Sequence, residues 1–171
     1  KKNVRAFQDT FKRHVSFFHG CYVNYNYPQL GKDLISVMNA LGYGVHLLEN
    51  EKCCGTALIS NRMIDQAKKN AVNNVESIRK SVYERQMPVI GTSSSCNFTI
   101  RDEYPHLLGI DNADVRDYIE LATRFIYRLI EEEKVCKAYS IPYSMSYGET
   151  RMGNLLDRAA SHDSGRRTYG P

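Results

Sequence analysis

The sequence predicts an α/β fold, a mainly parallel sheet with flanking helices, on three observations. Short β-prone runs occur at residues 15–18, 45–48 and 88–91, and each is followed by turn or loop residues. Longer segments between and after these runs carry apolar residues at helical spacing. The resulting order of strand and helix in strict alternation is typical of a parallel sheet joined by crossover helices.

Individual elements follow from the same patterns. The expected helices cover residues 30–41, 61–85 and 113–133. Gly42 ends the first helix. Residues 92–95 predict a turn that caps a short helix near Phe98. A fourth strand is expected at residues 137–139. A core of this kind is within reach of a chain of 171 residues, and that length favours one domain.

Three parts of the chain differ in composition. Residues 1–14 form a basic lead-in segment, in which Val4, Phe7, Phe11 and Val15, the residue that follows it, would share one helical face. Residues 15–139 form the α/β domain. Residues 140–171 are rich in Ser, Gly, Arg and Tyr and lack a sustained hydrophobic period, which predicts an irregular tail.

Charge and composition exclude several classes of protein. The formal net charge of +4 is concentrated in the lead-in segment, which holds five basic residues against Asp9. A short basic segment favours a membrane surface or an acidic partner, whereas nucleic-acid binding usually needs a basic face, so no nucleic acid is expected as a partner. No apolar run is long enough to span a membrane, and no export signal is present. Because the chain opens on lysine, a fragment or a processed product is expected.

Four cysteines are placed for metal or redox chemistry. Cys21 follows the first predicted strand, Cys53 and Cys54 follow the second, and Cys96 follows the third. Because the carboxyl ends of parallel strands meet at one edge of a sheet, these thiols should converge there. Iron–sulfur clusters need soft thiolate ligands, commonly four, and Gly55 would let the Cys-Cys loop turn. The sequence therefore predicts an iron–sulfur centre held by these four residues.

Other interpretations remain open at this point. A Cys₄ zinc site would use the same thiols, although zinc ribbons favour C-x₂-C pairs, which this chain lacks. His19 lies beside Cys21 and could join a mixed site, whereas His46, inside an apolar run, is expected to be structural. Cys136 is expected to be a buried apolar residue. The sequence contains no phosphate-binding Walker loop and no G-x-G-x-x-G motif, and it offers no pattern for a nucleophilic-cysteine enzyme.

The cysteine pattern resembles that of the cysteine-rich, or CCG, domain family. Its repeat is a single cysteine, then a Cys-Cys pair often followed by Gly, and then C-x-x-C. Longer stretches, among them FHGCYVNYNYPQLGKDL, EKCCGTALI and TSSSCNFTIRDEYPHLL, resemble the electron-carrying subunits of anaerobic glycerol-3-phosphate dehydrogenase complexes. This resemblance covers roughly residues 1 to 139.

The resemblance implies a non-catalytic electron-transfer subunit. It would hold a [4Fe-4S] or non-cubane cluster through Cys21, Cys53, Cys54 and Cys96. Its implied partners are flavin-containing catalytic subunits, a membrane surface and, indirectly, the quinone pool, at the cytoplasmic face of the inner membrane. The alternatives are a non-redox docking module with vestigial or zinc-binding cysteines, and a heterodisulfide-type oxidoreductase.

The sequence departs from the family pattern in three places. No ferredoxin-like region precedes the domain in this chain. Ser93 stands where the first cysteine of C-x-x-C is expected. A second repeat is expected to begin near Pro142 with Pro-Cys-His, but the chain there reads Pro142-Tyr143-Ser144, so the tail at residues 140–171 is interpreted as a degenerate second repeat.

Overall fold

The computed structural model describes residues 2–139, with side-chain burial described for residues 5–132. The chain divides into two compact units, Lys1–Phe125 and Ile126–Pro171. The first unit holds the whole sheet and the four cysteines of the predicted site. The expected tail at residues 140–171 lies outside the described part of the chain.

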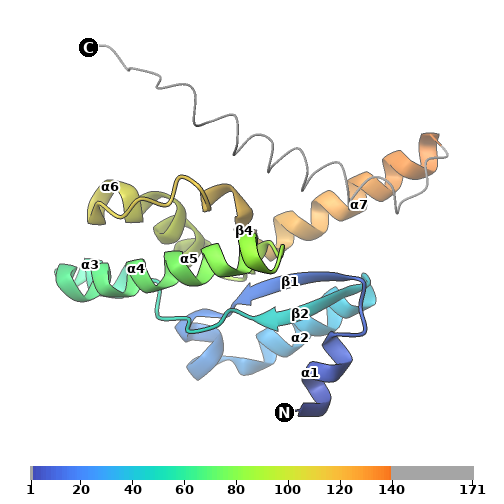
Figure 1. Ribbon diagram of the computed structural model, residues 1–171, viewed down its shortest axis with the longest axis horizontal. Coiled ribbons are helices and arrows are strands. Elements are labelled where there is room, and N and C mark those ends of the chain that lie inside the picture. Colours follow the sequence, from blue (N-terminus) through green and yellow to red (C-terminus); the bar gives the residue numbers. More distant parts are fainter. Residues whose placement is uncertain (1, 140–171) are drawn as a thin grey trace. The chain divides into compact units, whose positions relative to one another are not determined.

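Four parallel strands form one sheet in the order β2-β1-β3-β4 (Figure 1). They are β1 (Arg13–Phe18), β2 (Tyr43–Leu47), β3 (Val89–Gly91) and β4 (Ile119–Leu121). The register pairs Val15 with Val45 and Phe17 with Ile90. This order belongs to the doubly wound class, whose ligand sites lie at the strand carboxyl ends where the order reverses. Here the reversal occurs at β1, between β2 and β3.

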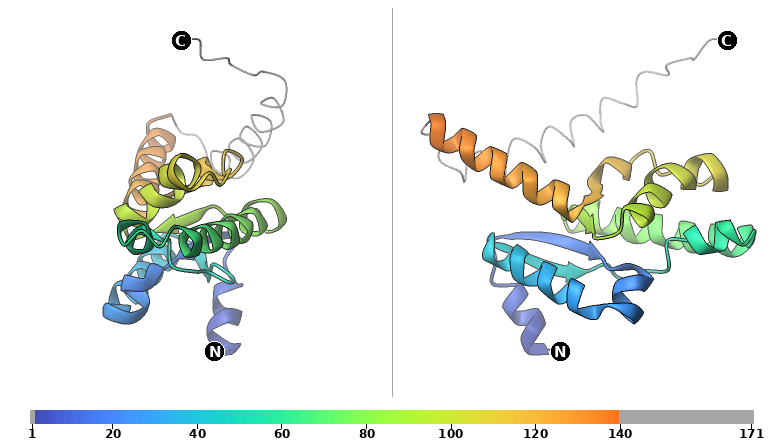
Figure 2. Two further views of the ribbon diagram at one scale, coloured as in Figure 1. Left: turned by 90° about the vertical axis from the view of Figure 1, so that its left-hand side faces the viewer. Right: turned by 180° about the vertical axis from the view of Figure 1, so that it is seen from behind.

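Two helices cover the sheet because its right-handed crossovers run in opposite directions from β1. Helix α2 (Pro28–Ala40) connects β1 to β2, and helix α4 (Ile64–Arg79) connects β2 to β3 through a π-helical turn at Lys80–Glu84. In Figures 1 and 2, α2 and α4 lie on opposite sides of β1 and β2. The inward face of α4 is fully buried and consists of small and branched residues, Ala67, Ala71, Val75 and Ile78.

Short helical segments complete the first unit. Those that follow the strands are a π-helical turn (Tyr22–Asn26), α3 (Thr56–Ser60), α5 (Ser94–Phe98), a second π-helical turn (Thr99–Glu103), α6 (Tyr104–Leu108) and a 3₁₀ turn (Arg116–Tyr118). Pro28 begins α2, where its missing N–H costs nothing, and Gly42, at φ +81°, follows the end of that helix as expected. The predicted α/β class, and three of its strands, are confirmed.

Two predictions at the carboxyl-terminal end of the domain are wrong. Residues 113–121, expected to begin a helix, instead form a turn, the 3₁₀ segment and strand β4, and helix α7 (Ala122–Tyr139) starts only afterwards. Residues 137–139, expected to be a strand, lie in that helix. The reason is that Ile119 and Leu121 satisfy a two-residue period, and pairing with β3 selects it.

The lead-in segment forms a shorter helix than its apolar spacing predicted. Helix α1 spans Lys2–Gln8, and the chain then turns into β1, so the expected single face is wrong. Phe7 is 54 % exposed and packs edge-on against Phe11 at 5.4 Å between ring centroids. The buried Gln8 side chain accepts a hydrogen bond from the backbone N–H of Val45 at 2.8 Å, which satisfies a donor on the outer strand β2.

Within residues 2–139, no helix combines the length and the apolar character that crossing a membrane requires.

Candidate functional site

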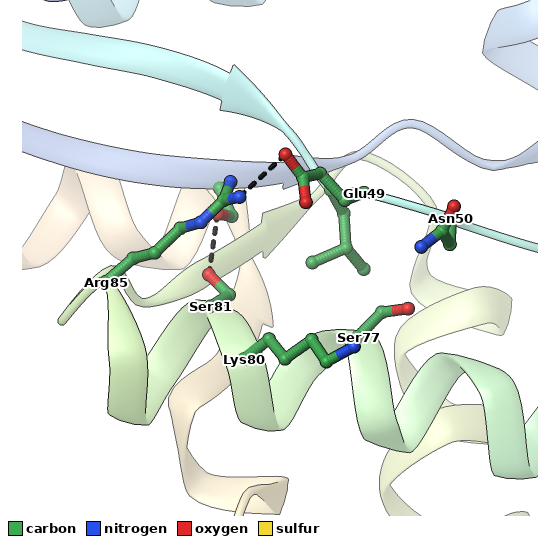
Figure 3. A pocket seen from close by; sticks show the side chains of 8 residues that line it. Glu49, Asn50, Ser77, Lys80, Ser81 and Arg85 are labelled. Carbon is green, nitrogen blue, oxygen red and sulfur yellow. Dashed lines mark hydrogen bonds and ion pairs between the residues drawn. The ribbon is translucent and has the colours of Figure 1, made fainter.

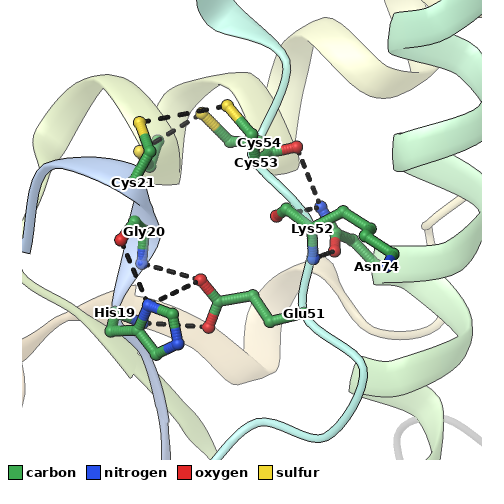
Figure 4. A network of polar contacts seen from close by, with 9 residues as sticks. His19, Gly20, Cys21, Glu51, Lys52, Cys53, Cys54 and Asn74 are labelled. Atoms are coloured by element: carbon green, nitrogen blue, oxygen red, sulfur yellow. Dashed lines mark hydrogen bonds and ion pairs between the residues drawn. The ribbon is translucent and has the colours of Figure 1, made fainter. Parts of the chain in front are cut away.

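The four predicted cysteines lie in the loops that follow β1, β2 and β3, at the carboxyl edge of the sheet. Cys21 comes after β1, Cys53 and Cys54 after β2, and Cys96 in the first turn after β3. Figure 4 shows the thiols of Cys21, Cys53 and Cys54 turned toward one another. Residues that are far apart in sequence are thus brought together by strand order alone.

The four sulfurs form two pairs of different exposure. The Sγ atoms of Cys21 and Cys53 lie 4.0 Å apart, and Cys21 is exposed. The Sγ atoms of Cys54 and Cys96 lie 3.2 Å apart, and both residues are buried. All four are free thiols. The adjacent cysteines therefore point to different partners, one toward the surface and one toward the interior.

The buried pair shares a proton unevenly. The Cys54 thiol donates to the sulfur of Cys96, and this hydrogen bond together with burial raises the pKa of Cys54. The same hydrogen bond lowers the pKa of Cys96, aided by Ser93. For the exposed pair, partial burial and then the neighbouring Cys53 raise the pKa of Cys21. Cys96 is therefore the thiol best prepared to act as a thiolate ligand.

A buried polar network fixes the backbone that carries Cys53 and Cys54. The Asn74 side chain, on α4, accepts from the N–H of Lys52 at 2.8 Å and donates to the carbonyl of Lys52 at 3.1 Å. It also donates to the hydroxyl of Tyr104 at 3.0 Å, and that hydroxyl donates to the carbonyl of Cys54 at 2.9 Å. Asn74 and Tyr104 are completely buried. The Cys-Cys loop is therefore held from α4 and α6 at once.

Gly55 ends this loop in a conformation that side chains rarely adopt. Its φ is +99°, and it is the N-cap of helix α3. The predicted role of Gly55 in letting the loop turn is confirmed. Thr56 then places its hydroxyl 3.2 Å from the sulfur of Cys54 and 2.7 Å from the hydroxyl of Thr99.

Glu51 connects the first cysteine loop to the second (Figure 4). Its carboxylate accepts backbone hydrogen bonds from His19 at 3.0 Å and Gly20 at 2.7 Å, and it faces the Nδ1 atom of His19 at 3.3 Å. Burial raises the pKa of Glu51 to about 6. The His19 ring is therefore a partner of this carboxylate, and no contact between it and a sulfur is seen among the described interactions.

Ser93 occupies the position of the first cysteine of C-x-x-C with a different role. Its side chain accepts from the N–H of Cys96 at 3.4 Å and so caps helix α5, which confirms the predicted turn and short helix. The position thus helps to orient Cys96 and supplies no sulfur.

His46 faces the lead-in side of β2. Its Nε2 lies 3.4 Å from Asp9, and its ring lies 5.1 Å from that of His14. Burial and then His14 lower the pKa of His46. These contacts agree with the structural role expected for it. Cys136 lies in α7, outside the residues whose side chains are described.

A small pocket beside β1 and β2 is separate from the sulfurs (Figure 3). It is lined by Ser16, Leu48, Glu49, Asn50, Ser77, Lys80, Ser81 and Arg85. Arg85 and Glu49 form an ion pair of 2.6 Å across it, and Ser81 donates to Ser16 at 2.6 Å. Because its charged groups are already paired and no cysteine lines it, this pocket is not the candidate site.

The donor set suits a cluster of several irons. Four thiols, two buried and two nearer the surface, come from three rigidly held loops, and iron in such clusters takes thiolate ligands. Among the described residues, no group of three or more His, Cys, Asp or Glu side chains is placed to hold a single metal ion. The sulfurs therefore present two pairs to a larger group, and the residues fit an iron–sulfur cluster.

Sequence reasoning did not find the residues that support the cysteines. Glu51, Asn74 and Tyr104 were not among the expected site residues. One signal was available for Asn74, because it lies on the apolar stripe of α4 between Ala71 and Ile78, where a polar residue needs a buried partner. Glu51 and Tyr104 carry no such signal, since their partners are backbone atoms of distant loops.

This fold and cysteine set define a class of protein. The model of the cysteine-rich domain family matches residues 15–101, and the chain belongs to that family.

Curated relatives are consistent with this membership. One of them, from Escherichia coli (strain K12), is the anaerobic glycerol-3-phosphate dehydrogenase subunit that carries the letter C. It is 53 % identical over 146 residues, which are 85 % of this chain and 37 % of that protein. The chain therefore spans little more than a third of that relative.

More distant relatives share a smaller part of the chain. An uncharacterized iron–sulfur protein of Methanocaldococcus jannaschii is 30 % identical over 66 % of this chain and 22 % of its own length. Lactate utilization protein A of Bacillus subtilis (strain 168) is 32 % identical over 57 % of this chain and 38 % of its own length. No solved structure matches the chain.

Proposed function

We propose that this chain is the cluster-binding part of an iron–sulfur electron-transfer subunit, with Cys21, Cys53, Cys54 and Cys96 as ligands. The observation that carries the proposal is the convergence of four free thiols from three strand ends into two close pairs. A cluster bound there would supply reversible electron uptake and release. The [4Fe-4S] and non-cubane forms are the types that we propose.

The chain's own residues prepare the site for this role in two ways. Asn74, Tyr104 and Glu51 hold the cysteine loops, so little rearrangement is needed when the oxidation state changes. The exposure of Cys21 brings one side of the site to the surface, where a redox partner can approach. The burial of Cys54 and Cys96 keeps water away from the other side.

We propose that the partners are the flavin-containing catalytic subunits of an anaerobic glycerol-3-phosphate dehydrogenase. The similarity to the Escherichia coli protein supports this assignment. Electrons would pass through this subunit toward the quinone pool, and the chain itself would not oxidise glycerol 3-phosphate. Residues 15–139 would be the cluster domain and residues 140–171 the remnant of a second repeat.

We further propose a peripheral position at the cytoplasmic face of the inner membrane, with the lead-in segment at residues 1–14 touching lipid or a partner. Its basic charge supports this. Arg13 is an exception, because its guanidinium lies over the ring of Tyr43 at 4.6 Å. Flotation with vesicles of anionic lipid, with and without residues 1–8, tests the contact, and equal flotation of both chains would refute it.

Anaerobic reconstitution with ferrous iron and sulfide tests the central proposal. The chain should bind iron and acid-labile sulfide in near-equal amounts and give an EPR signal in one oxidation state. Cys53→Ser and Cys54→Ser should each lose most of the bound iron, whereas Cys136→Ser should retain it as the matched control. A folded chain that binds zinc but no iron would instead support the docking-module alternative.

A further inference from the structure

Glu51 is a buried carboxylate that joins two of the cysteine loops. Its side chain is only 4 % exposed. The Oε1 atom accepts from the N–H of Gly20 at 2.7 Å, and Oε2 accepts from the N–H of His19 at 3.0 Å. Both carboxylate oxygens are therefore bound to consecutive backbone donors, an arrangement that fixes a carboxylate in orientation as well as in position.

The two ends of this connection lie next to cysteines. Gly20 directly precedes Cys21, and Glu51 lies two residues before Cys53. Figure 4 shows the carboxylate placed between the loop of β1 and the loop of β2, on the side of the loops away from the sulfurs. The distance between the thiols of Cys21 and Cys53, 4.0 Å, is thus set by loops that this one side chain connects.

The two thiol pairs depend on different supports. The loop of Cys53 and Cys54 is held by Asn74 and Tyr104, and Cys96 is oriented by the cap of α5. None of these contacts reaches Cys21, which follows Gly20 at the surface. Among the described side-chain hydrogen bonds, those of Glu51 are the ones that attach the loop before Cys21 to the loop before Cys53.

We propose that Glu51 is a positioning residue, which sets the separation of Cys21 and Cys53 and thereby the exposed half of the cluster site. The inference rests on the proposed function for its purpose, but the positioning itself is a property of the metal-free chain. A residue that only stabilised the fold would affect both thiol pairs alike. A positioning residue for the Cys21 loop affects one pair and spares the other.

Two versions of the full chain make the pairs separately measurable. In one, Cys21 and Cys53 are the only cysteines, and in the other, only Cys54 and Cys96 remain, with the rest replaced by serine. Each is equilibrated with reduced and oxidised glutathione. One oxidised glutathione and two protein thiols give one protein disulfide and two reduced glutathione molecules, so the equilibrium constant reports how closely the two thiols are held.

Glu51→Gln is the informative variant. Glutamine has nearly the same size, but it offers one acceptor oxygen where the two backbone donors need two, and its NH₂ group would face a donor. We expect the equilibrium constant for the Cys21–Cys53 disulfide to fall at least tenfold, with the Cys54–Cys96 value changed less than twofold. Glu49→Gln is the matched control, because Glu49 is exposed and pairs with Arg85, and it should leave both values unchanged.

Two results would overturn the inference. Equal constants for wild type and Glu51→Gln would show that the carboxylate does not hold the exposed pair, and an equal fall in both pairs would show a general role in folding. The reconstitution experiment decides the proposed function separately. A wild-type chain that fails to bind iron would refute the cluster while leaving the thiol measurements of Glu51 intact.

Discussion

The hydroxyl of Tyr104 and the carbonyl oxygen of Cys54 lie 2.9 Å apart in a buried hydrogen bond that joins helix α6 to the cysteine loop. The same hydroxyl accepts from Asn74, so one phenol connects α4, α6 and the backbone of a proposed ligand. Burial is the main cause that raises the pKa of Tyr104, which therefore stays protonated and keeps its donor. The loop is thus held by neutral groups whose hydrogen bonds do not change near neutral pH.

Tyr104→Phe should destabilise the metal-free chain by about 1–3 kcal/mol, because it leaves a buried carbonyl and a buried amide donor without this partner. The measurement is unfolding by urea at neutral pH. Tyr83→Phe is the control, since the Tyr83 hydroxyl donates to the carbonyl of Asp114 at a partly exposed position. There water can replace the lost bond, so a cost below about 1 kcal/mol is expected. Equal costs for the two variants would contradict the role of Tyr104.

The stability of the metal-free chain should depend on pH through Glu51. Burial raises its pKa in the folded chain to about 6, from an ordinary value of 4.5. A carboxyl whose folded pKa is raised stabilises the fold at low pH, and this contribution is lost as the pH rises through about 6. Relative to Glu51→Gln, the wild type should therefore lose up to about 2 kcal/mol of unfolding free energy between pH 4.5 and pH 7.5.

Glu49 provides a control of opposite sign. The ion pair with Arg85 lowers the pKa of Glu49, so its contribution is present above pH 4.5 and is lost as the pH falls below it. Urea unfolding of wild type, Glu51→Gln and Glu49→Gln across this range, with the thiols kept reduced, measures both. If the difference between wild type and Glu51→Gln does not vary with pH, the carboxylate titrates alike in the folded and unfolded chains.

The strand ends could be predicted from sequence, but the last strand could not. Val15–Phe18 and Val89–Gly91 are apolar runs bounded by turns, so their type and their following cysteines were evident. Ile119–Leu121 has only three residues, and its inward positions also fit a helical stripe that continues into α7. A strand this short is selected by pairing with β3, which a local pattern does not contain.

The site was predictable in its ligands and unpredictable in their support. Thiols at successive strand ends converge whenever the strands are parallel, so Cys21, Cys53, Cys54 and Cys96 could be grouped without coordinates. Glu51, in contrast, acts through backbone N–H groups of His19 and Gly20, which every sequence possesses. Its partners are chosen by loop geometry and leave no trace in residue type.

Gly55→Ala should cost more stability than the same change at Gly109. Gly55 has φ +99°, and Gly109 has φ +66° with ψ +27°, close to the left-handed region that other residues can enter. We expect a loss of about 1 kcal/mol at Gly109 and a clearly larger one at Gly55. Space does not explain the difference, because an added Cβ at Gly55 would meet Ala67 at an ordinary 3.6 Å. Urea unfolding measures both, and a smaller cost at Gly55 would contradict the backbone argument.

Ser93→Ala tests whether this serine, at a position where the family pattern has cysteine, serves Cys96 as a helix cap. The change removes the acceptor for the N–H of Cys96 and should destabilise the chain by about 1 kcal/mol. It should also raise the pKa of Cys96, because Ser93 is one of the groups that lower it. Alkylation of Cys96 by iodoacetamide against pH, in the chain that retains only Cys54 and Cys96, measures this shift. Ser95→Ala is the control, since the Ser95 hydroxyl contacts only that of Ser93 among the described hydrogen bonds, so an equal shift there would show that Ser93 does not act as the cap.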